Sequence, residues 1–278
     1  MSTLRIEHRT AFKYAAPVVS SYNEARLTPA WLPRQRVLEN KIEVSPLSWQ
    51  TSYRDYWESD VTVFEITQPH SSLTVTSSSL VEVLPHAHRE ERADWDALNV
   101  PRFQDLLCEY LALTPVTRPT DELLAFAREA AGNGAPDAAA RQICDFLHDE
   151  INYVPGVTNV HTPAADAWAA RSGVCQDFAH LAIGAMRAVG IPARYVSGYL
   201  HPNREAALGE TVSGESHAWV EWWGGDWFGY DPTNASEVGD HHVIVARARE
   251  YRDVRPLSGV VAGTTTDLDV TVNVTTVA

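Results

Sequence analysis

Alternation of apolar and polar residues dominates the first 84 positions of the chain. Clusters of Pro and Ser separate the alternating runs, which lie at residues 4–8, 41–44, 61–66 and 80–84. A period of two places successive side chains on opposite faces of a strand, so each run predicts a half-buried strand. Several short strands at this spacing predict a β-sandwich-like domain over residues 1–84.

Residues 85–100 are charged and lack periodicity, so we expect a linker there. Beyond it, apolar residues recur at helical spacing in two runs that open at Thr120 and Asp137. A loop is expected over residues 154–163, and β character returns toward the end of the chain. The fold class is therefore predicted as α+β. Residues 101–278 are expected to pack helices on an antiparallel sheet and to include a C-terminal β segment.

The most informative helix carries a cysteine in its first turn. Ser172 or Gly173 is the expected N-cap, and Gly190 followed by Pro192 is the expected stop. Cys175 would then lie where free backbone N–H groups and the helix dipole favour a thiolate and can hold an oxyanion. A free cysteine is commonly only a small buried hydrophobe.

That packing interpretation is the one we expect for the two remaining cysteines. Cys108 and Cys144 each lie inside an apolar run at helical spacing, whereas Cys175 follows a Ser-Gly loop. Position at a helix start therefore singles out Cys175 as the candidate nucleophile.

A predicted hairpin downstream carries a histidine and an aspartate. Glycines after Trp223 predict the turn, and a three-residue loop would set Trp223 opposite Trp227. Asp231 then becomes the diagonal neighbour of His217, whereas a two-residue turn would point it away. A lone histidine on a strand and an Asp-Pro pair are each usually structural. Together with Cys175 they predict a nucleophile, a base (His217) and an orienting group (Asp231).

Composition excludes several other classes of function. The chain has 278 residues, of which 45% are hydrophobic, and a formal net charge of −14. An acidic chain argues against a nucleic-acid surface and against docking to an anionic membrane. Three dispersed cysteines without a CxxC pair argue against a disulfide framework or zinc cluster, and no metal is expected. Among the other histidines, His86, His88, His241 and His242 lack ligand spacing and are expected at the surface, whereas His161 and His201 are expected on loops near the site.

The beginning MSTLRIEHRT has no apolar leader, and no stretch of the sequence reaches the length of a membrane span. A cytoplasmic location is therefore expected. The sequence leaves the oligomeric state open.

Four short motifs resemble the transglutaminase-like superfamily. They are Gly173-Val174-Cys175 with Asp177, Gly190-Ile191-Pro192-Ala193-Arg194, His217-Ala218-Trp219-Val220-Glu221 and Asp231-Pro232-Thr233. Residues 8–29, 69–70 and 251–259 resemble the bacterial cysteine protease branch, which carries its own N-terminal β domain. The resemblance implies a papain-like fold and triad roles for Cys175, His217 and Asp231. It also implies a further oxyanion donor, and the candidates for oxyanion or substrate contact are Tyr153, Gln176 and Trp219.

The expected reaction is thiolate attack on an amide or peptide carbonyl of a peptide or protein substrate. It would pass through a thioester and require no cofactor. Because no calcium-loop or gated-lid pattern is visible, hydrolysis of a peptide, isopeptide or side-chain amide is favoured. The alternatives are transfer of a protein glutamine to an amine, a catalytically silent binding module of the same fold, and a metal-dependent hydrolase.

Overall fold

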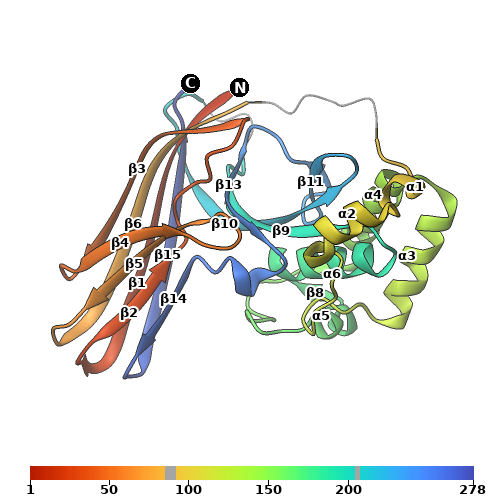
Figure 1. Cartoon of the computed structure of the whole chain (residues 1–278). Helices are drawn as coiled ribbons and strands as arrows, with labels where there is room; N and C mark the ends of the chain where they lie inside the picture. Colours follow the sequence, from red (N-terminus) through yellow and green to blue (C-terminus); the bar gives the residue numbers. More distant parts are fainter. Residues whose placement is uncertain (85–91, 204–206) are drawn as a thin grey trace.

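Strands from both ends of the chain form the first of two parts (Figure 1). The computed structural model describes residues 1–84, 92–203 and 207–278. Antiparallel sheets combined with helices on one side confirm the predicted α+β class. None of the helices in the described residues is both long and apolar enough to cross a membrane.

The first part is a sandwich of two antiparallel layers. One layer has the order β15 (Thr265–Thr276), β1 (Ser2–Val18), β6 (His70–Val83) and β3 (Gln35–Ser45). The other has the order β14 (Leu257–Val261), β2 (Ser21–Ala25), β5 (Asp60–Ile66) and β4 (Trp49–Arg54). Alternating side chains of both layers meet in an apolar core made by Tyr14, Val18, Ala25, Leu27, Phe64, Ile66, Leu73 and Val75.

The last strands of the chain belong to this sandwich by their pairing. β15 lies beside β1 with Leu4 opposite Thr276, and β14 lies beside β2 with Leu257 opposite Ala25. The sequence-based boundaries placed these strands with residues 101–278 instead. Alternation of apolar and polar residues identifies a strand but not its partner. The pattern therefore cannot predict that strands at the two ends of the chain pair with each other.

The second part is built on strands β9 (Ala193–Leu200), β10 (Thr211–Trp223), β11 (Trp227–Asp231), β12 (Ser236–Glu237) and β13 (His242–Ala248). β10 connects the two parts, because its first residues pair with β15 and its later ones with β9 and β11. Gly214 lies at this transition, where a Cβ would come within 2.5 Å of the Val274 side chain. The absence of a side chain lets the strand pass from one sheet environment to the next.

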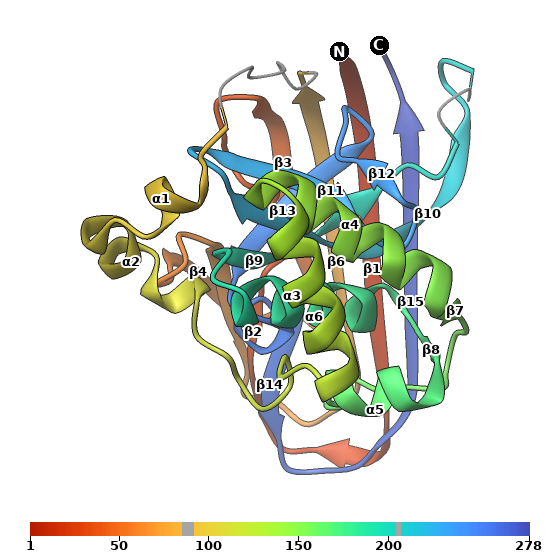
Figure 2. The same cartoon turned by 90° about the vertical axis from the view of Figure 1, so that its right-hand side faces the viewer.

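Helices cover one face of this second sheet, as Figure 2 shows. They are α3 (Asp121–Asn133), α4 (Pro136–Glu150), α5 (Ala164–Ala170) and α6 (Cys175–Ala188). The fully buried side chains of Val220 and Trp222 on β10 share a core with Phe178, Leu181 and Ile143 of the helices. α6 is buried along nearly its whole length and is thereby held rigidly beneath the sheet.

The expected linker over residues 85–100 falls partly on residues 85–91, which lie outside the described residues together with His86 and His88. Its second half contains the short helix α1 (Trp95–Leu98), which is followed by α2 (Pro101–Leu106) and the turn η1 (Cys108–Tyr110). Cys144 is buried as predicted, but Cys108 is exposed. The apolar run around Cys108 is broken into two short helical turns, so its helical spacing does not create a buried stripe.

Candidate active site

Cys175 is the first residue of α6. The cap residue is Val174, so the helix begins later than the predicted cap at Ser172 or Gly173. Asp177 caps the start of the helix, because its carboxylate accepts a hydrogen bond from the Val174 N–H at 2.8 Å. A Cβ on Gly173 would lie 2.7 Å from Asp177, so the close approach of this turn requires glycine. The arrangement leaves Cys175 partly accessible while the following residues are buried.

The loop before the helix is tied to the same carboxylate. The Thr158 hydroxyl donates to Asp177 Oδ2 at 2.6 Å, and the Gln176 amide donates to Asn159 O at 3.4 Å. The pKa of Asp177 is raised, because burial outweighs the opposite effect of its two donors, the Thr158 hydroxyl and the Val174 N–H. The loop over residues 154–163 therefore has a fixed anchor beside Cys175.

His217 and Asp231 are brought together by the hairpin of β10 and β11. Trp223 pairs with Trp227 across a three-residue loop, which confirms the predicted register. His217 Nε2 donates to Asp231 Oδ2 at 2.7 Å, and both side chains are buried. Gly198 on the neighbouring strand pairs with His217, and a Cβ there would collide with the carbonyl oxygen of Val243.

The Asp231 carboxylate is held by several donors. Its Oδ1 accepts the backbone N–H groups of Thr233 at 3.0 Å and of Asn234 at 3.3 Å. The Asn234 amide donates to Oδ2 at 2.7 Å. Burial raises the pKa of Asp231, but the side chains of His217, His242 and Asn234 outweigh it and hold the pKa well below its usual range. Asp231 is therefore an anion over the whole physiological range.

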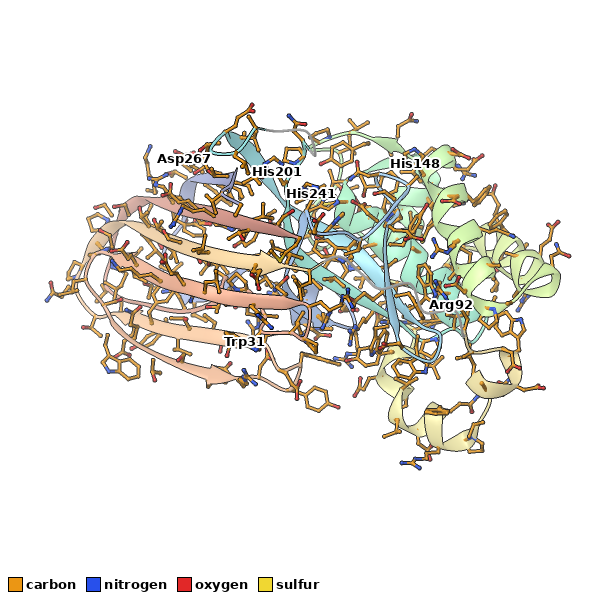
Figure 3. All side chains as sticks on the ribbon, turned by 90° about the horizontal axis from the view of Figure 1, so that it is seen from above. Trp31, Arg92, His148, His201, His241 and Asp267 are labelled. Carbon is orange, nitrogen blue, oxygen red and sulfur yellow. The ribbon has the colours of Figure 1, made fainter. Side chains whose placement is uncertain are left out.

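The turn that carries these donors is fixed from outside by a helix. His148 at the end of α4 donates its Nδ1–H to the carbonyl oxygen of Thr233 at 3.0 Å. Figure 3 shows His148 on the helical side of the molecule, away from the sandwich. The Thr233–Asn234 backbone is therefore held in the position from which it donates to Asp231.

His217 lies between this anion and the cysteine. Burial lowers the pKa of His217, but Asp231 and the nearby Cys175 outweigh it and raise the pKa. Nδ1, the ring nitrogen left for Cys175, makes no hydrogen bond of ordinary geometry among the described residues. Long contacts of this kind are usual before substrate binds. The raised pKa favours an imidazolium beside the sulfur, which is the partner that a thiolate requires.

A cavity of about 610 Å³ opens beside the pair. His217 and Asp231 line it together with Tyr153, Leu200, His201, Pro202, Thr233, Asn234, Ser236 and His242. Tyr153 belongs to β7 (Asn152–Tyr153), which pairs with β8 (Ser172–Gly173) so that Tyr153 is opposite Gly173. This pairing brings Tyr153, a predicted oxyanion candidate, to the strand that precedes α6, and Tyr153 also lines the cavity. Figure 3 shows that His201 lies where the sandwich meets the helical part.

The other candidates for substrate contact have different positions. Trp219 is 0% exposed and packs with Val196, Val238 and Ile244, so the prediction that it contacts substrate is wrong. Gln176 is buried and its amide is directed to the loop. His161 is exposed and is not among the residues that line this cavity. Trp219 and Gln176 are buried by the elements packed around them, which sequence spacing does not reveal.

Two residues of the site were missed by the sequence reasoning. Asn234 was assigned no role, although its side chain holds Asp231. His242 was expected at the surface but is 2% exposed, with Nε2 3.6 Å from Asp231 Oδ2. The available signal is the nearly continuous apolar run of β13, in which His242 is the first residue and six of the seven residues are buried. Within the described ranges no group of three or more His, Cys, Asp or Glu side chains could hold a metal ion.

Comparison with known proteins matches both parts of the chain. Residues 124–232 match the family model of the transglutaminase-like superfamily, and residues 4–82 match that of the bacterial transglutaminase-like N-terminal region. Uncharacterized protein ML0607 of Mycobacterium leprae is 42% identical over 279 residues and aligns over 100% of both chains. The protein-glutamine gamma-glutamyltransferase of Pseudomonas aeruginosa is 34% identical over 100 residues, or 31% of this chain and 15% of that protein.

A solved structure described as a candidate cysteine protease from Cytophaga hutchinsonii has the same fold. Its TM-score is 0.77 at 20% identity, and the match covers 100% of this chain and 92% of that one.

Proposed function

This chain belongs to the transglutaminase-like superfamily, and we propose that it is a thiol-dependent enzyme that attacks amide or peptide carbonyls through a thioester. Cys175 is the nucleophile, His217 the base and later the acid, and Asp231 the group that orients His217. One observation carries the proposal: His217 lies between the buried Asp231, at 2.7 Å, and a cysteine at the first position of a buried helix.

The proposed reaction has two halves that share His217. The Cys175 thiolate attacks the carbonyl carbon, and the free N–H groups at the start of α6 stabilise the oxyanion. The Tyr153 hydroxyl is a candidate for a further donor. His217 then gives its Nδ1 proton to the leaving amine as the C–N bond breaks, which leaves a thioester. His217 next takes a proton from water, which attacks the thioester, releases the acid and restores the thiolate.

The polar lining of the cavity supports water as the acyl acceptor. Thr233, Asn234 and Ser236 lie beside His217, so water can occupy the side from which the thioester is attacked. Trp219 lies beside His217 but is fully buried and offers no surface to an amine. Trp223 and Trp227 pack against each other at the far end of the hairpin, about 20 Å along the strand from His217. We therefore favour hydrolysis of a peptide, isopeptide or side-chain amide.

Transfer of a protein glutamine to an amine is the second candidate. Its support is the similarity of 100 residues of this chain to a protein-glutamine gamma-glutamyltransferase. Both reactions use the same thioester, so the triad geometry favours neither.

The test has two stages, and the first asks whether Cys175 is activated. Iodoacetamide should alkylate Cys175 much faster than Cys108, which is exposed and serves as the internal reference. The Cys175→Ala variant should abolish turnover of any substrate found in amide and peptide libraries while keeping the fold. Equal labelling of both cysteines would leave the silent binding module as the better account. Activity in Cys175→Ala would show that Cys175 is not the nucleophile.

The second stage separates water from amine. A substrate that is turned over is incubated with a millimolar primary amine, and mass spectrometry measures free acid against amide adduct. Mainly free acid is expected. Mainly adduct would replace the hydrolase by the amine transferase.

A further inference from the structure

A second buried histidine reaches the same carboxylate oxygen as His217. His242, the first residue of β13, has its Nε2 3.6 Å from Asp231 Oδ2, while Nε2 of His217 is 2.7 Å from that oxygen. The side chain of His242 is 1% exposed and that of Asp231 is 0% exposed. Two imidazole rings from different strands therefore share one buried anion.

The tautomer of His242 follows from its other ring nitrogen. The backbone N–H of Gly239 points at His242 Nδ1 at 3.2 Å, and an N–H can only donate. Nδ1 must therefore carry a lone pair, so the proton of the neutral ring is on Nε2, the atom that faces Asp231. A donor is thus directed at the anion by a fixed backbone contact.

The ring of His242 has little freedom to turn away. The indole of Trp219 meets it edge to face, with centroids 5.2 Å apart, and also lies 6.1 Å from the ring of His217. Trp219 is fully buried and fills the space beside both histidines. By contrast, Asn234, the side chain that also donates to Oδ2, is on an exposed turn. The more rigid of these two restraints on Oδ2 is His242.

We infer that His242 is a positioning residue, which holds Asp231 Oδ2 in the direction of His217 and so keeps the imidazolium aligned with Cys175. This inference rests on the proposed function, because it assigns His242 a role only through Asp231 and His217. His242 touches no substrate in this scheme. It acts as the third buried group in a line from the thiol, after His217 and Asp231.

Cys144 is a further titratable group near Asp231, and it does not compete for this role. Cys144 of α4 lies close enough to Asp231 for the two groups to interact electrostatically. Burial, Asp145 and Asp231 all raise the pKa of Cys144, so that this thiol stays neutral. His217 and His242 are therefore the histidines that determine how the Asp231 charge is used.

The experiment is a double-mutant cycle read by iodoacetamide alkylation of Cys175 from pH 5 to pH 9. His242→Asn keeps an acceptor for the Gly239 N–H but loses the group that faces Asp231. His242→Gln keeps a donor that reaches Asp231. We expect His242→Asn to slow alkylation at pH 6 about fivefold, the effect of one lost hydrogen-bond donor, and to move the acidic limb to higher pH. His242→Gln should recover most of the rate.

The Asp231→Ala background decides between a positioning role and a merely structural one. If His242 acts through Asp231, His242→Asn should cause no further loss in that background. An equal loss in both backgrounds, or an acidic limb that is unmoved or moved to lower pH, overturns the inference and leaves the proposed function intact. A wild-type Cys175 that reacts no faster than Cys108 overturns both. Urea unfolding of each variant verifies that the alkylated protein is folded.

Discussion

Replacing Asp231 by asparagine tests the orientation of His217, because it replaces the acceptor that faces His217 by a donor. Oδ1 of Asp231 accepts from the backbone N–H groups of Thr233 and Asn234, which cannot themselves accept. In Asp231→Asn the amide oxygen therefore keeps this place, and the NH₂ group takes the position of Oδ2. That position is 2.7 Å from His217 Nε2, so a donor now faces a nitrogen that was itself donating.

The consequence is the wrong tautomer of His217. Nε2 must accept from the new NH₂ group, so the neutral ring carries its proton on Nδ1, the nitrogen left for Cys175. Such a ring cannot take the thiol proton. In a serine protease triad the same exchange costs about 10⁴-fold in turnover, and we expect ~10²–10⁴-fold here. Alkylation of Cys175 at pH 7 should fall at least about tenfold, because the thiol loses the imidazolium partner that favours its reactive thiolate form.

A matched variant separates the tautomer from the loss of charge. Asp231→Ala also removes the carboxylate, but it offers no NH₂ group, and the adjacent cavity admits water to His217 Nε2. We therefore expect the rate of Cys175 alkylation to fall in the order wild type, Asp231→Ala, Asp231→Asn. Mass spectrometry of iodoacetamide-treated protein measures it, with the exposed Cys108 as internal reference. Asp231→Asn that reacts as fast as wild type, or faster than Asp231→Ala, would refute the tautomer argument.

Two further predictions concern the strands that hold the site. Glu221→Gln should lower the free energy of unfolding by about 3 kcal/mol in urea, because the buried Glu221 carboxylate contacts Arg194 at 2.6 Å and Arg247 at 3.0 Å. Burial raises the pKa of Glu221, but the two arginines outweigh it and lower the pKa. The stabilisation is therefore present above the pKa of Glu221 in the unfolded chain and is lost as the pH falls through its pKa in the folded protein. An effect of the variant that does not change with pH would contradict this. Gly198→Ala should lower the free energy of unfolding by about 2 kcal/mol, because its Cβ meets a backbone carbonyl. The measurement is the fall in melting temperature. Gly239→Ala, where a Cβ meets nothing within 4 Å, is the control, and an equal shift in both would show that the crowding is relieved.

The parts of the site that sequence predicted are those set by local geometry. The stop of α6 at Gly190, which has φ 88°, follows from the residue type. The approach of Asp231 to His217 follows from the parity of a short loop, since an odd loop puts both on one face. Neither inference requires knowledge of any other element.

The parts that it missed depend on which strands become neighbours. His242 comes from β13, which pairs with β9 and not with the hairpin that carries Asp231. The apolar run of β13 predicts a buried strand, but whether its first histidine faces solvent or an anion depends on the elements packed around it. The same reason explains why Trp219 was assigned to substrate contact. It shares a face with His217 along β10, but a layer formed by Val238 and Ile244 closes that face.

The sandwich is part of the site because one strand serves both. Residues 211–214 of β10 are paired with β15, which is itself paired with β1. His217 follows three residues after Gly214, about 10 Å farther along the strand. The position of the base along its strand is therefore fixed by a ladder that begins in the sandwich. The motifs around Cys175 and His217 do not include the N-terminal part. The pairing of β10 with β15, and of β15 with β1, makes that part a support for His217. A displacement of about 1 Å in a catalytic group can cost about 10²-fold in rate. Substitutions in the β10–β15 ladder should therefore lower the reaction rate, although they change no residue of the triad.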